Sequence, residues 1–243
     1  MTALVEVPPL VLTEVPRRIA IMLDGNRRWA RERGLQPWEG HWQGAAALVP
    51  IVRAAAEMGV QVLTVWGLST ENWGRPQNEV DAILRYIGLY LDWQRAPMVR
   101  DGVRFGTIGD LSKLSSGLQK KLEKTKLATA GGSRIELVLA LNYGGRDDLR
   151  RAITRLAQEC VEGRLSPSQI SEEMIASHVD TAPWGDPDLL IRPGGSLRLS
   201  NFLLWQCSYT EVVVTDTLWP DFTPDHLKDA ISEFQNRKRR FGR

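Results

Sequence analysis

The sequence is poor in cysteine, in histidine and in long apolar runs, and each shortage excludes a class of protein. Its 243 residues include only two cysteines, Cys160 and Cys207, so there is no disulfide framework and no CxxC metal pair. The three histidines show no metal-ligand spacing, which argues against a zinc centre. No apolar run approaches the roughly 20 residues that cross a bilayer. A reducing cytoplasm is therefore the expected setting, with both thiols in the core.

An excess of charge of one sign is missing as well. With 31 basic and 29 acidic side chains the formal net charge is +2, so no nucleic-acid partner is expected. The length and the 43% hydrophobic content fit one large α/β domain. Residues 1–16, "MTALVEVPPLVLTEVP", lack the positive start of a signal peptide and contain three prolines. They are expected to form a loose leader before a single domain over residues 17–243.

Hydrophobic periodicity predicts alternating strands and helices. Strands are expected at 18–23, 60–68, 103–109, 134–142, 188–192 and 211–216. Helical periodicity is clearest at 43–58, 77–99, 115–128, 146–161 and 224–239. This alternation predicts an α/β fold with a mostly parallel sheet of about six strands and helices on both faces. Pro50 predicts a kink or an interruption in the first of these helices.

Polar clusters follow four of the expected strands, at the end where ligands bind in sheets of this kind. They read "DGNRRW" at 24–29, "LSTENWGRP" at 68–76, "NYGGRDD" at 142–148 and "IRPGGSLRLSNFLLWQ" at 191–206. Asp24 with Arg28 in the first cluster could form a site, but a surface turn in which Asp24 caps a helix stays open.

Two of these clusters suit a ligand with an anionic head and an apolar tail. Arg192 and Arg198 flank two glycines with Ser200 just after, and this donor set suits a diphosphate. "NFLLWQ" is expected to begin a helix whose amino end faces the same anion. Exposure of the large apolar side chain of Trp73 in a polar loop is unfavourable unless a ligand covers it. A glycine-rich loop with solvated arginines, and a simple turn into the helix near Gln77, stay open as alternatives.

Carboxylates at strand ends raise the question of a metal. Asp24 and Glu211 could hold a hard cation, most simply magnesium bridging to phosphate. His41, close after the first cluster, is either structural or on the phosphate side. Asp147 and Asp148 lack the third aspartate of a DDxxD metal motif, and they are expected in the first turn of a helix, where acids favour the macrodipole.

Taken in order, these segments resemble the motifs of the cis-prenyltransferase family, most closely the bacterial undecaprenyl diphosphate synthases. The motifs are "IMLDGNRRWA", "GH" at 40–41, "LSTENWGRP", "IGD" at 108–110, "NYGGR", "DLLIRPGG" with "RLSNFLLWQ", "YTE" at 209–211, "LWPDF" at 218–222 and "RRFG" near the end. So many long motifs in one order make a specific signal. The resemblance implies condensation of isopentenyl diphosphate onto an allylic diphosphate such as farnesyl diphosphate, with cis double bonds, to make a long-chain polyprenyl diphosphate. It also implies magnesium (Mg2+), a homodimer and an apolar tunnel for the prenyl chain.

The resemblance implies a role for each matching residue. Asp24 matches the essential aspartate and a metal ligand, Asn72 the position assigned to proton acceptance, and Glu211 a second metal ligand. Substrate binding is implied for Gly25, Asn26, Arg27, Arg28, Trp29 and His41 beside the allylic diphosphate, for Ser69, Thr70, Glu71, Trp73 and Arg75 in a mobile loop, and for Arg192, Arg198, Leu199 and Ser200 around isopentenyl diphosphate. Gly67 matches a position that leaves the tunnel open, and Ile135 matches its floor. Arg240 and Gly242 match an Arg-x-Gly that approaches the partner's site.

The chain departs from the bacterial pattern at four positions. Pro37 stands where an arginine is usual, so that Arg31 or Arg33 is expected to supply the grip on phosphate. Pro193, Ser196 and Leu197 replace the usual threonine, glutamate and, in some members, histidine. These changes bear on the metal shell and the rate.

Other functions stay open at this point. The product could be of medium or short length, and the chain could be a non-catalytic subunit of a heteromer. A phosphohydrolase with Asp24 as nucleophile would need a second aspartate two residues on, where Asn26 stands. A peripheral membrane contact for product release also stays open.

Overall fold

Six parallel strands form the central sheet in the order β3-β4-β2-β1-β5-β6. The computed structural model describes residues 15–237. Every strand lies within about two residues of an expected apolar run, because strands of a parallel sheet are covered on both faces. The strands are β1 (Arg18–Met22), β2 (Val62–Ser69), β3 (Val103–Ile108), β4 (Ile135–Tyr143), β5 (Leu189–Pro193) and β6 (Glu211–Thr215).

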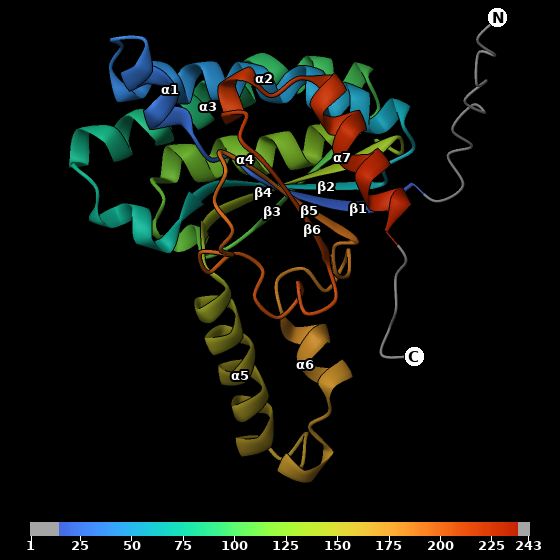
Figure 1. Cartoon of the computed structure of the whole chain (residues 1–243). Coiled ribbons are helices and arrows are strands. Elements are labelled where there is room, and N and C mark those ends of the chain that lie inside the picture. Colours follow the sequence, from blue (N-terminus) through green and yellow to red (C-terminus); the bar gives the residue numbers. More distant parts are fainter. Residues whose placement is uncertain (1–14, 238–243) are drawn as a thin grey trace, which may run out of the picture.

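Helices cover one face of this sheet, and two more project from the other (Figure 1). The helices are α1 (Asn26–Glu32), α2 (Pro37–Glu57), α3 (Gln77–Arg100), α4 (Ser116–Thr129), α5 (Gly145–Val161), α6 (Glu172–His178) and α7 (Pro224–Asn236). The main core lies between α2, α3, α4 and α7 and the sheet face that carries Ile21, Val65 and Leu139. Five of these helices overlap the segments of helical periodicity, whereas α1 and α6 were not expected.

The opposite face of the sheet differs from expectation, since helices do not cover it. Phe202 and Leu203 pack there against Ala20, Met22 and Leu190 of the strands. The expected helix over "NFLLWQ" is wrong, because this segment forms turns. Its residues Asn201 and Leu203 have φ angles of 71° and 45°, in the left-handed region through which an α-helix does not continue. No helix amino end is therefore available to the loop before it.

Both prolines of α2 fit without interrupting the helix. Pro37 is in the first turn, where no backbone N–H is required, and Gln36 and Glu39 form a capping box around it. The helix then runs through Pro50 to Glu57, so the expected interruption does not occur. Packing of the buried Ile51 next to Pro50 shows how tertiary contacts override the local preference.

The strand order places one crevice at the carboxyl edge of the sheet. From β1 the chain moves to β2 on one side, and β5 later returns to the other side of β1. In open α/β sheets such a switch point is where ligands bind. The loops after β1 and β5, which carry Asp24 and residues 193–200, leave the sheet on either side of it.

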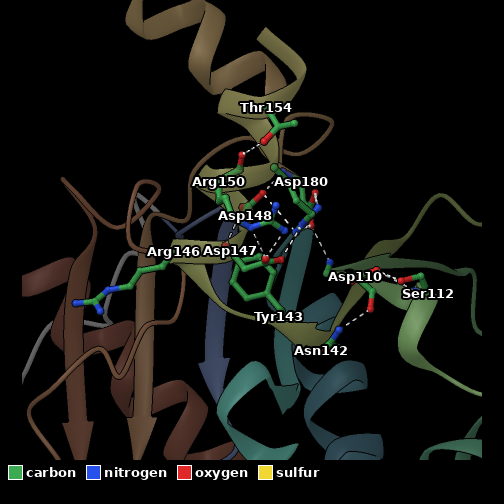
Figure 2. Close-up of polar contacts among 12 residues, drawn as sticks. Asp110, Ser112, Asn142, Tyr143, Arg146, Asp147, Asp148, Arg150, Thr154 and Asp180 are labelled. Atoms are coloured by element: carbon green, nitrogen blue, oxygen red, sulfur yellow. Dashed lines mark hydrogen bonds and ion pairs between the residues drawn. The ribbon is translucent and has the colours of Figure 1, made fainter. Parts of the chain in front are cut away.

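A buried polar cluster anchors α5 on the far face (Figure 2). The Tyr143 hydroxyl and the Gln206 amide donate to Asp148 Oδ2 at 3.0 and 3.1 Å, and the Asp180 N–H donates to Asp148 Oδ1 at 2.9 Å. Arg151 donates twice to Asp180 at 2.6 Å. Burial, with the nearby Asp180 charge, raises the pKa of Asp148. The first-turn position expected for Asp147 and Asp148 is confirmed, and Asp148 acts as a structural acceptor.

Three smaller expectations have different outcomes. Cys160 and Cys207 are free, but both are partly exposed and not core thiols. Burial raises the pKa of Cys207 to about 11.

Within residues 15–237, no helix has the length and apolar character that crossing a membrane requires. Nearly all of the leader, and the Arg240–Gly242 segment, lie outside the described residues.

Candidate active site

A cavity of about 680 Å³ opens at the switch point. Its polar and charged lining comes from the carboxyl ends of β1, β2 and β5, the loops after them and the amino-terminal turns of α1 and α2, whereas its apolar lining comes mainly from α2, α3 and the strands. Its polar lining includes Asp24, Gly25, Asn26, Arg27, Arg28, His41, Ser69, Glu71, Asn72, Arg75, Arg192, Arg198, Ser200 and Asn201. Its apolar lining includes Leu48, Ile83, Tyr86, Ile87, Tyr90, Phe105, Leu137 and Leu139. One cavity thus joins a cationic mouth to an apolar chamber.

Asp24 and Arg192 meet at the mouth from adjacent strands. Arg192 Nη2 donates to Asp24 Oδ2 at 2.8 Å, and Arg192 Nη1 donates to the Ser200 hydroxyl at 3.0 Å and to the Arg198 carbonyl. The Arg192 side chain is 5% exposed and that of Asp24 is 36% exposed. The buried Arg192 Nε–H has no partner among the described residues. An oxygen of a bound anion would satisfy this donor.

The loop of Asp24 is held in place by the "LWPDF" segment. Gly25 has a φ of 108°, and a Cβ there would lie 2.9 Å from Leu218 Cδ2, so both backbone and space require glycine. The Trp219 N–H donates to the Asp24 carbonyl at 2.9 Å, and its indole donates to the Gly44 carbonyl at 2.8 Å. The fully buried Trp219 therefore fixes the loop of Asp24 against α2.

Arg28 and Arg198 complete the cationic mouth. Arg28 Nη2 donates to the Gly194 carbonyl at 2.6 Å, which ties the loop after β1 to the loop after β5. Arg198 is exposed, and its guanidinium makes no hydrogen bond or ion pair within residues 15–237. Its planar fork is therefore available to a phosphate group.

Glu79 is a central residue that the sequence did not single out. It is 5% exposed and accepts from Arg75 at 2.9 Å, and its carboxylate lies 3.3 Å from His41 Nε2 and 3.6 Å from Arg27 Nε. The one available signal was an acid in the first turn of α3, which is ordinary at a helix start. Burial lowers the pKa of His41, although the contact with Glu79 opposes this. His41 is therefore neutral at pH 7.

The loop after β2 forms a short 3₁₀ helix, Thr70–Gly74, closed by a reciprocal cap. The Ser69 hydroxyl accepts from the Asn72 N–H at 3.2 Å, and the Ser69 N–H donates to Asn72 Oδ1 at 3.1 Å. The amide oxygen of Asn72 is thus already engaged. Thr70 donates to Glu71 at 3.1 Å, and Trp73 donates its indole N–H to Asn142 at 2.7 Å.

Glu71 connects this loop to the loop after β5. Its Oε1 accepts from the Asn201 amide at 2.6 Å. Partial burial opposes ionisation of Glu71, but hydrogen bonds from Asn201, from its own backbone N–H, and from Thr70 and Ser69 outweigh it and lower its pKa. The ionised carboxylate holds the two loops together over the mouth.

Several residues assigned to the substrates do not line the cavity. Thr70, Trp73 and Leu199 point to protein partners or to the second core instead. Trp29 lies on the outer side of α1, where its indole donates to Asp221 at 2.7 Å. Arg33, one of the two candidates to replace the missing arginine, stacks over Trp29 at 4.4 Å and pairs with Asp221 at 2.9 Å. Arg31, the other candidate, does not line the cavity either.

Glu211 does not meet Asp24 in this chain. Glu211 begins β6, where it is paired in register with Leu189 at the start of β5. Leu189 is paired in turn with Ile19, near the start of β1. Asp24 follows the other end of β1. Glu211 instead pairs with Arg237 at 3.0 Å. Asp24 and Glu211 of one chain therefore lie at opposite ends of the strands and do not bind the same ion, and the role of Glu211 as a metal ligand stays a prediction.

The chamber ends earlier than expected. Phe105 and Leu137 are level with each other and line its deep part, whereas Ile135 is buried but does not line it. Ile135 has the same orientation as Leu137 and lies two residues farther from the mouth. Phe105 and Leu137 therefore form the floor, with Ile135 behind it. Gly67 does line the cavity, at a bulge of β2 where the pairing register shifts.

Asp24 is the carboxylate at the mouth that fits a magnesium ion. Its Oδ2 is taken by Arg192, which leaves Oδ1 free of protein donors within residues 15–237. No group of three or more His, Cys, Asp or Glu in this part of the chain could form an all-protein metal site. Mg2+ commonly binds through one or two carboxylates plus substrate phosphates, and this donor set fits that mode.

Comparison with known proteins decides the family. The model of the family described as "Putative undecaprenyl diphosphate synthase" matches residues 21–242. The chain belongs to this cis-prenyltransferase family. The isoprenyl transferase of Chlamydia pneumoniae is 46% identical over 96% of this chain and 94% of its own length. That of Heliobacterium mobile is 44% identical over 94% of this chain and 88% of its own.

Solved structures of the family have the same fold. Lavandulyl diphosphate synthase from Lavandula x intermedia, in complex with dimethylallyl diphosphate, superposes with a TM-score of 0.92 at 36% identity, over 94% of this chain and 99% of its own. A probable undecaprenyl diphosphate synthase from Campylobacter jejuni gives 0.79 at 33% identity, over 95% of this chain and all of its own. The chain is thus an enzyme, a cis-prenyltransferase.

Proposed function

We propose that this cis-prenyltransferase condenses isopentenyl diphosphate onto an allylic diphosphate, most simply farnesyl diphosphate, to make a long-chain polyprenyl diphosphate with cis double bonds. The observation that carries the proposal is the cavity, which joins a cationic mouth to an apolar chamber. A 150 Å³ protein cavity holds benzene, which corresponds to about 25 Å³ per non-hydrogen atom. On that scale the cavity of about 680 Å³ holds about 27 such atoms, close to the roughly two dozen of farnesyl diphosphate.

The mouth offers two sets of diphosphate donors. Arg27 and Arg28, with Asp24 and neutral His41 beside them, are assigned to the allylic diphosphate. Arg192, Arg198 and Ser200 are assigned to isopentenyl diphosphate, which is consistent with the unsatisfied Nε–H of Arg192. Magnesium held by Asp24 Oδ1 and substrate phosphates would neutralise the charge of the departing diphosphate.

The chain's own residues supply positioning and water exclusion. The allylic carbon–oxygen bond breaks, the double bond of isopentenyl diphosphate attacks the resulting carbon centre, and one proton leaves the adduct. Arginines around the leaving group stabilise its negative charge, and the walls of Leu48, Ile83 and Leu139 exclude water from the cation. Asn72 is assigned to the proton-acceptor side. Since its amide oxygen already accepts from Ser69, the departing diphosphate is the stronger base there.

Product length is the finer part of the proposal. The resemblance sets it at about ten or eleven isoprene units, and the favourable burial of each added unit, about 0.8 kcal/mol per CH₂, drives elongation. A medium- or short-chain product is the second candidate, favoured by the limited volume of the chamber and by the likeness to a structure that binds dimethylallyl diphosphate.

A homodimer is also proposed. Beyond the family resemblance, the projecting α5 exposes Ile153 and Val161 at 58% and 81%, and apolar side chains on a projecting helix are typical of a surface that another chain covers. The cytoplasmic location and a peripheral membrane contact remain predictions.

Incubation with labelled isopentenyl diphosphate, farnesyl diphosphate and magnesium tests the reaction. Extraction into organic solvent measures elongation, and chromatography of the dephosphorylated products measures length. We expect label in long prenyl alcohols. Products of fifteen to twenty-five carbons would establish the second candidate, and no incorporation at all would contradict the proposed function.

A further inference from the structure

The chamber is too small for the whole of the proposed product. At about 25 Å³ per carbon, a chain of about fifty carbons needs about 1,250 Å³. The cavity measures about 680 Å³, and part of that is the polar mouth. Because protein interiors are close-packed, the floor of Phe105 and Leu137 does not yield this difference. Most of a long tail must therefore lie elsewhere.

A second hollow lies on the outer side of α2 and α3, next to the chamber. We name it the aromatic groove and define it by Trp29, Leu35, Trp38, Trp42, Tyr86 and Leu89, and the exposed Glu39 and Gln43 also line it. Leu35, Trp38 and Trp42 are each 37% exposed, and the neighbouring Trp93 is 56% exposed. Large apolar side chains gathered at one surface mark a site that binds an apolar ligand or partner.

Tyr86 separates the two hollows. It lines both the chamber and the aromatic groove. Its ring contacts Trp42 of α2 with centroids 5.5 Å apart, and Trp42 in turn contacts Trp93 at 4.9 Å. The half-buried Tyr86 makes no hydrogen bond with any residue of the described chain, so that no hydrogen bond fixes its side chain. A rotation of Tyr86 would connect the chamber to the groove between α2 and α3.

We infer that the aromatic groove is the second part of the prenyl-binding path, and that the growing tail enters it past Tyr86 once the chamber is full. The inference rests on the proposed long-chain product, since a shorter product stays inside the chamber. Indole and phenol rings suit this ligand because their flat apolar faces pack on isoprene units while their polar edges stay in water. The allylic end of the chain stays at the mouth throughout.

Leu89→Glu tests the inference, because Leu89 lines the groove and not the chamber. The groove already has the exposed Glu39 among its lining residues, and a second carboxylate in place of the apolar Leu89 side chain would make burial of a hydrocarbon tail there unfavourable. We expect the main product to shift from about fifty carbons to at most about 25, because the whole cavity, mouth included, holds only about 27 non-hydrogen atoms. Val99→Glu is the matched control, since Val99 lies on the same helix, is 50% exposed and lines neither hollow. Its activity and product length should equal those of the wild type.

Each outcome decides the matter. Thermal unfolding curves identify a folded variant, and Trp38→Glu in the first turn of α2 replaces Leu89→Glu if the latter does not fold. A folded Leu89→Glu protein with wild-type product length overturns the inference and leaves the proposed function intact. A wild-type enzyme that stops near 25 carbons also overturns it. Unchanged product length together with lost sedimentation on phosphatidylglycerol vesicles would assign the groove to a lipid surface instead. Absence of any condensation would contradict the proposed function itself.

Discussion

Replacement of Asp24 should separate its contribution to catalysis from its contribution to stability. Asp24→Ala removes both the free Oδ1 and the Oδ2 that accepts from Arg192 at 2.8 Å. Asp24→Asn keeps an acceptor for Arg192 but removes the negative charge. Both variants should lose at least about 10²–10³ in kcat/KM, or roughly 3–4 kcal/mol, the scale for one group that stabilises transition-state charge.

The stability cost follows from the burial of the two side chains. Removal of one partner of a fully buried ion pair costs about 3–5 kcal/mol, because the other charge is left uncompensated. Arg192 is 5% exposed, but Asp24 is 36% exposed, so water reaches the pair and the loss for Asp24→Ala should be nearer about 1–3 kcal/mol. Asp24→Asn should lose less than about 1 kcal/mol.

Two measurements check these values. Urea unfolding gives the free energy of unfolding, and incorporation of labelled isopentenyl diphosphate at saturating magnesium gives the rate. Asp24→Asn should be almost as stable as the wild type and nearly inactive. An Asp24→Asn enzyme with wild-type turnover would refute the assignment of Asp24. An Asp24→Ala protein of unchanged stability would refute the importance of the Arg192 pair.

Four further predictions concern the mouth and the chamber. Arg198→Ala should raise the KM for isopentenyl diphosphate about 10-fold or more, because it loses about 1.5–3 kcal/mol of charged hydrogen bonding. If steady-state kinetics show equal increases in KM for both substrates, the assignment of Arg198 to the isopentenyl diphosphate subsite is wrong. Glu79→Gln keeps an acceptor but removes the buried negative charge that faces Arg75 and Arg27, so it should lower the free energy of unfolding by about 1–3 kcal/mol, while Asp81→Asn on the same helix should not change it in urea titrations. Gly67→Leu should shorten the product on chromatography, because even its Cβ would lie 2.9 Å from Leu139 Cδ1; unchanged length would show that the chain does not pass Gly67. Burial lowers the pKa of His41 in the folded state, so the unfolded chain binds a proton more readily and the protein loses stability as the pH falls below about 6.5. His41→Gln should flatten this part of the curve of unfolding free energy against pH. Identical curves for the wild type and the variant would contradict this.

The strands were predictable because their signal is local. Runs such as "RIAIML" and "RIELVLALN" are apolar throughout, as the covering of both faces of a parallel sheet requires, and each became a strand. The helix expected over "NFLLWQ" failed for a physical reason. Its apolar residues are buried against the sheet, but by turns with left-handed residues, which periodicity does not distinguish from a short helix.

The site was predictable where chemistry follows a strand end. Asp24, Asn72 and Arg192 all line the cavity because parallel strands bring their carboxyl ends to one edge. Glu211 begins β6, as the expected strand at 211–216 has it, but parallel strands all begin at the end opposite the mouth, so Glu211 does not reach Asp24 of the same chain. Glu79 was missed because its role depends on Arg27, Arg75 and His41, which the fold alone brings together.

The division of the cavity into a polar mouth and an apolar chamber has an evolutionary consequence. The mouth is built by loops after β1, β2 and β5, and the floor by Phe105 and Leu137 within β3 and β4. Substitutions at the floor can therefore accumulate without disturbing Asp24 or its arginines. Selection can act on the product through one set of positions while the reaction is conserved through another. A chain with this architecture can therefore change the length of its product while its catalytic edge stays the same.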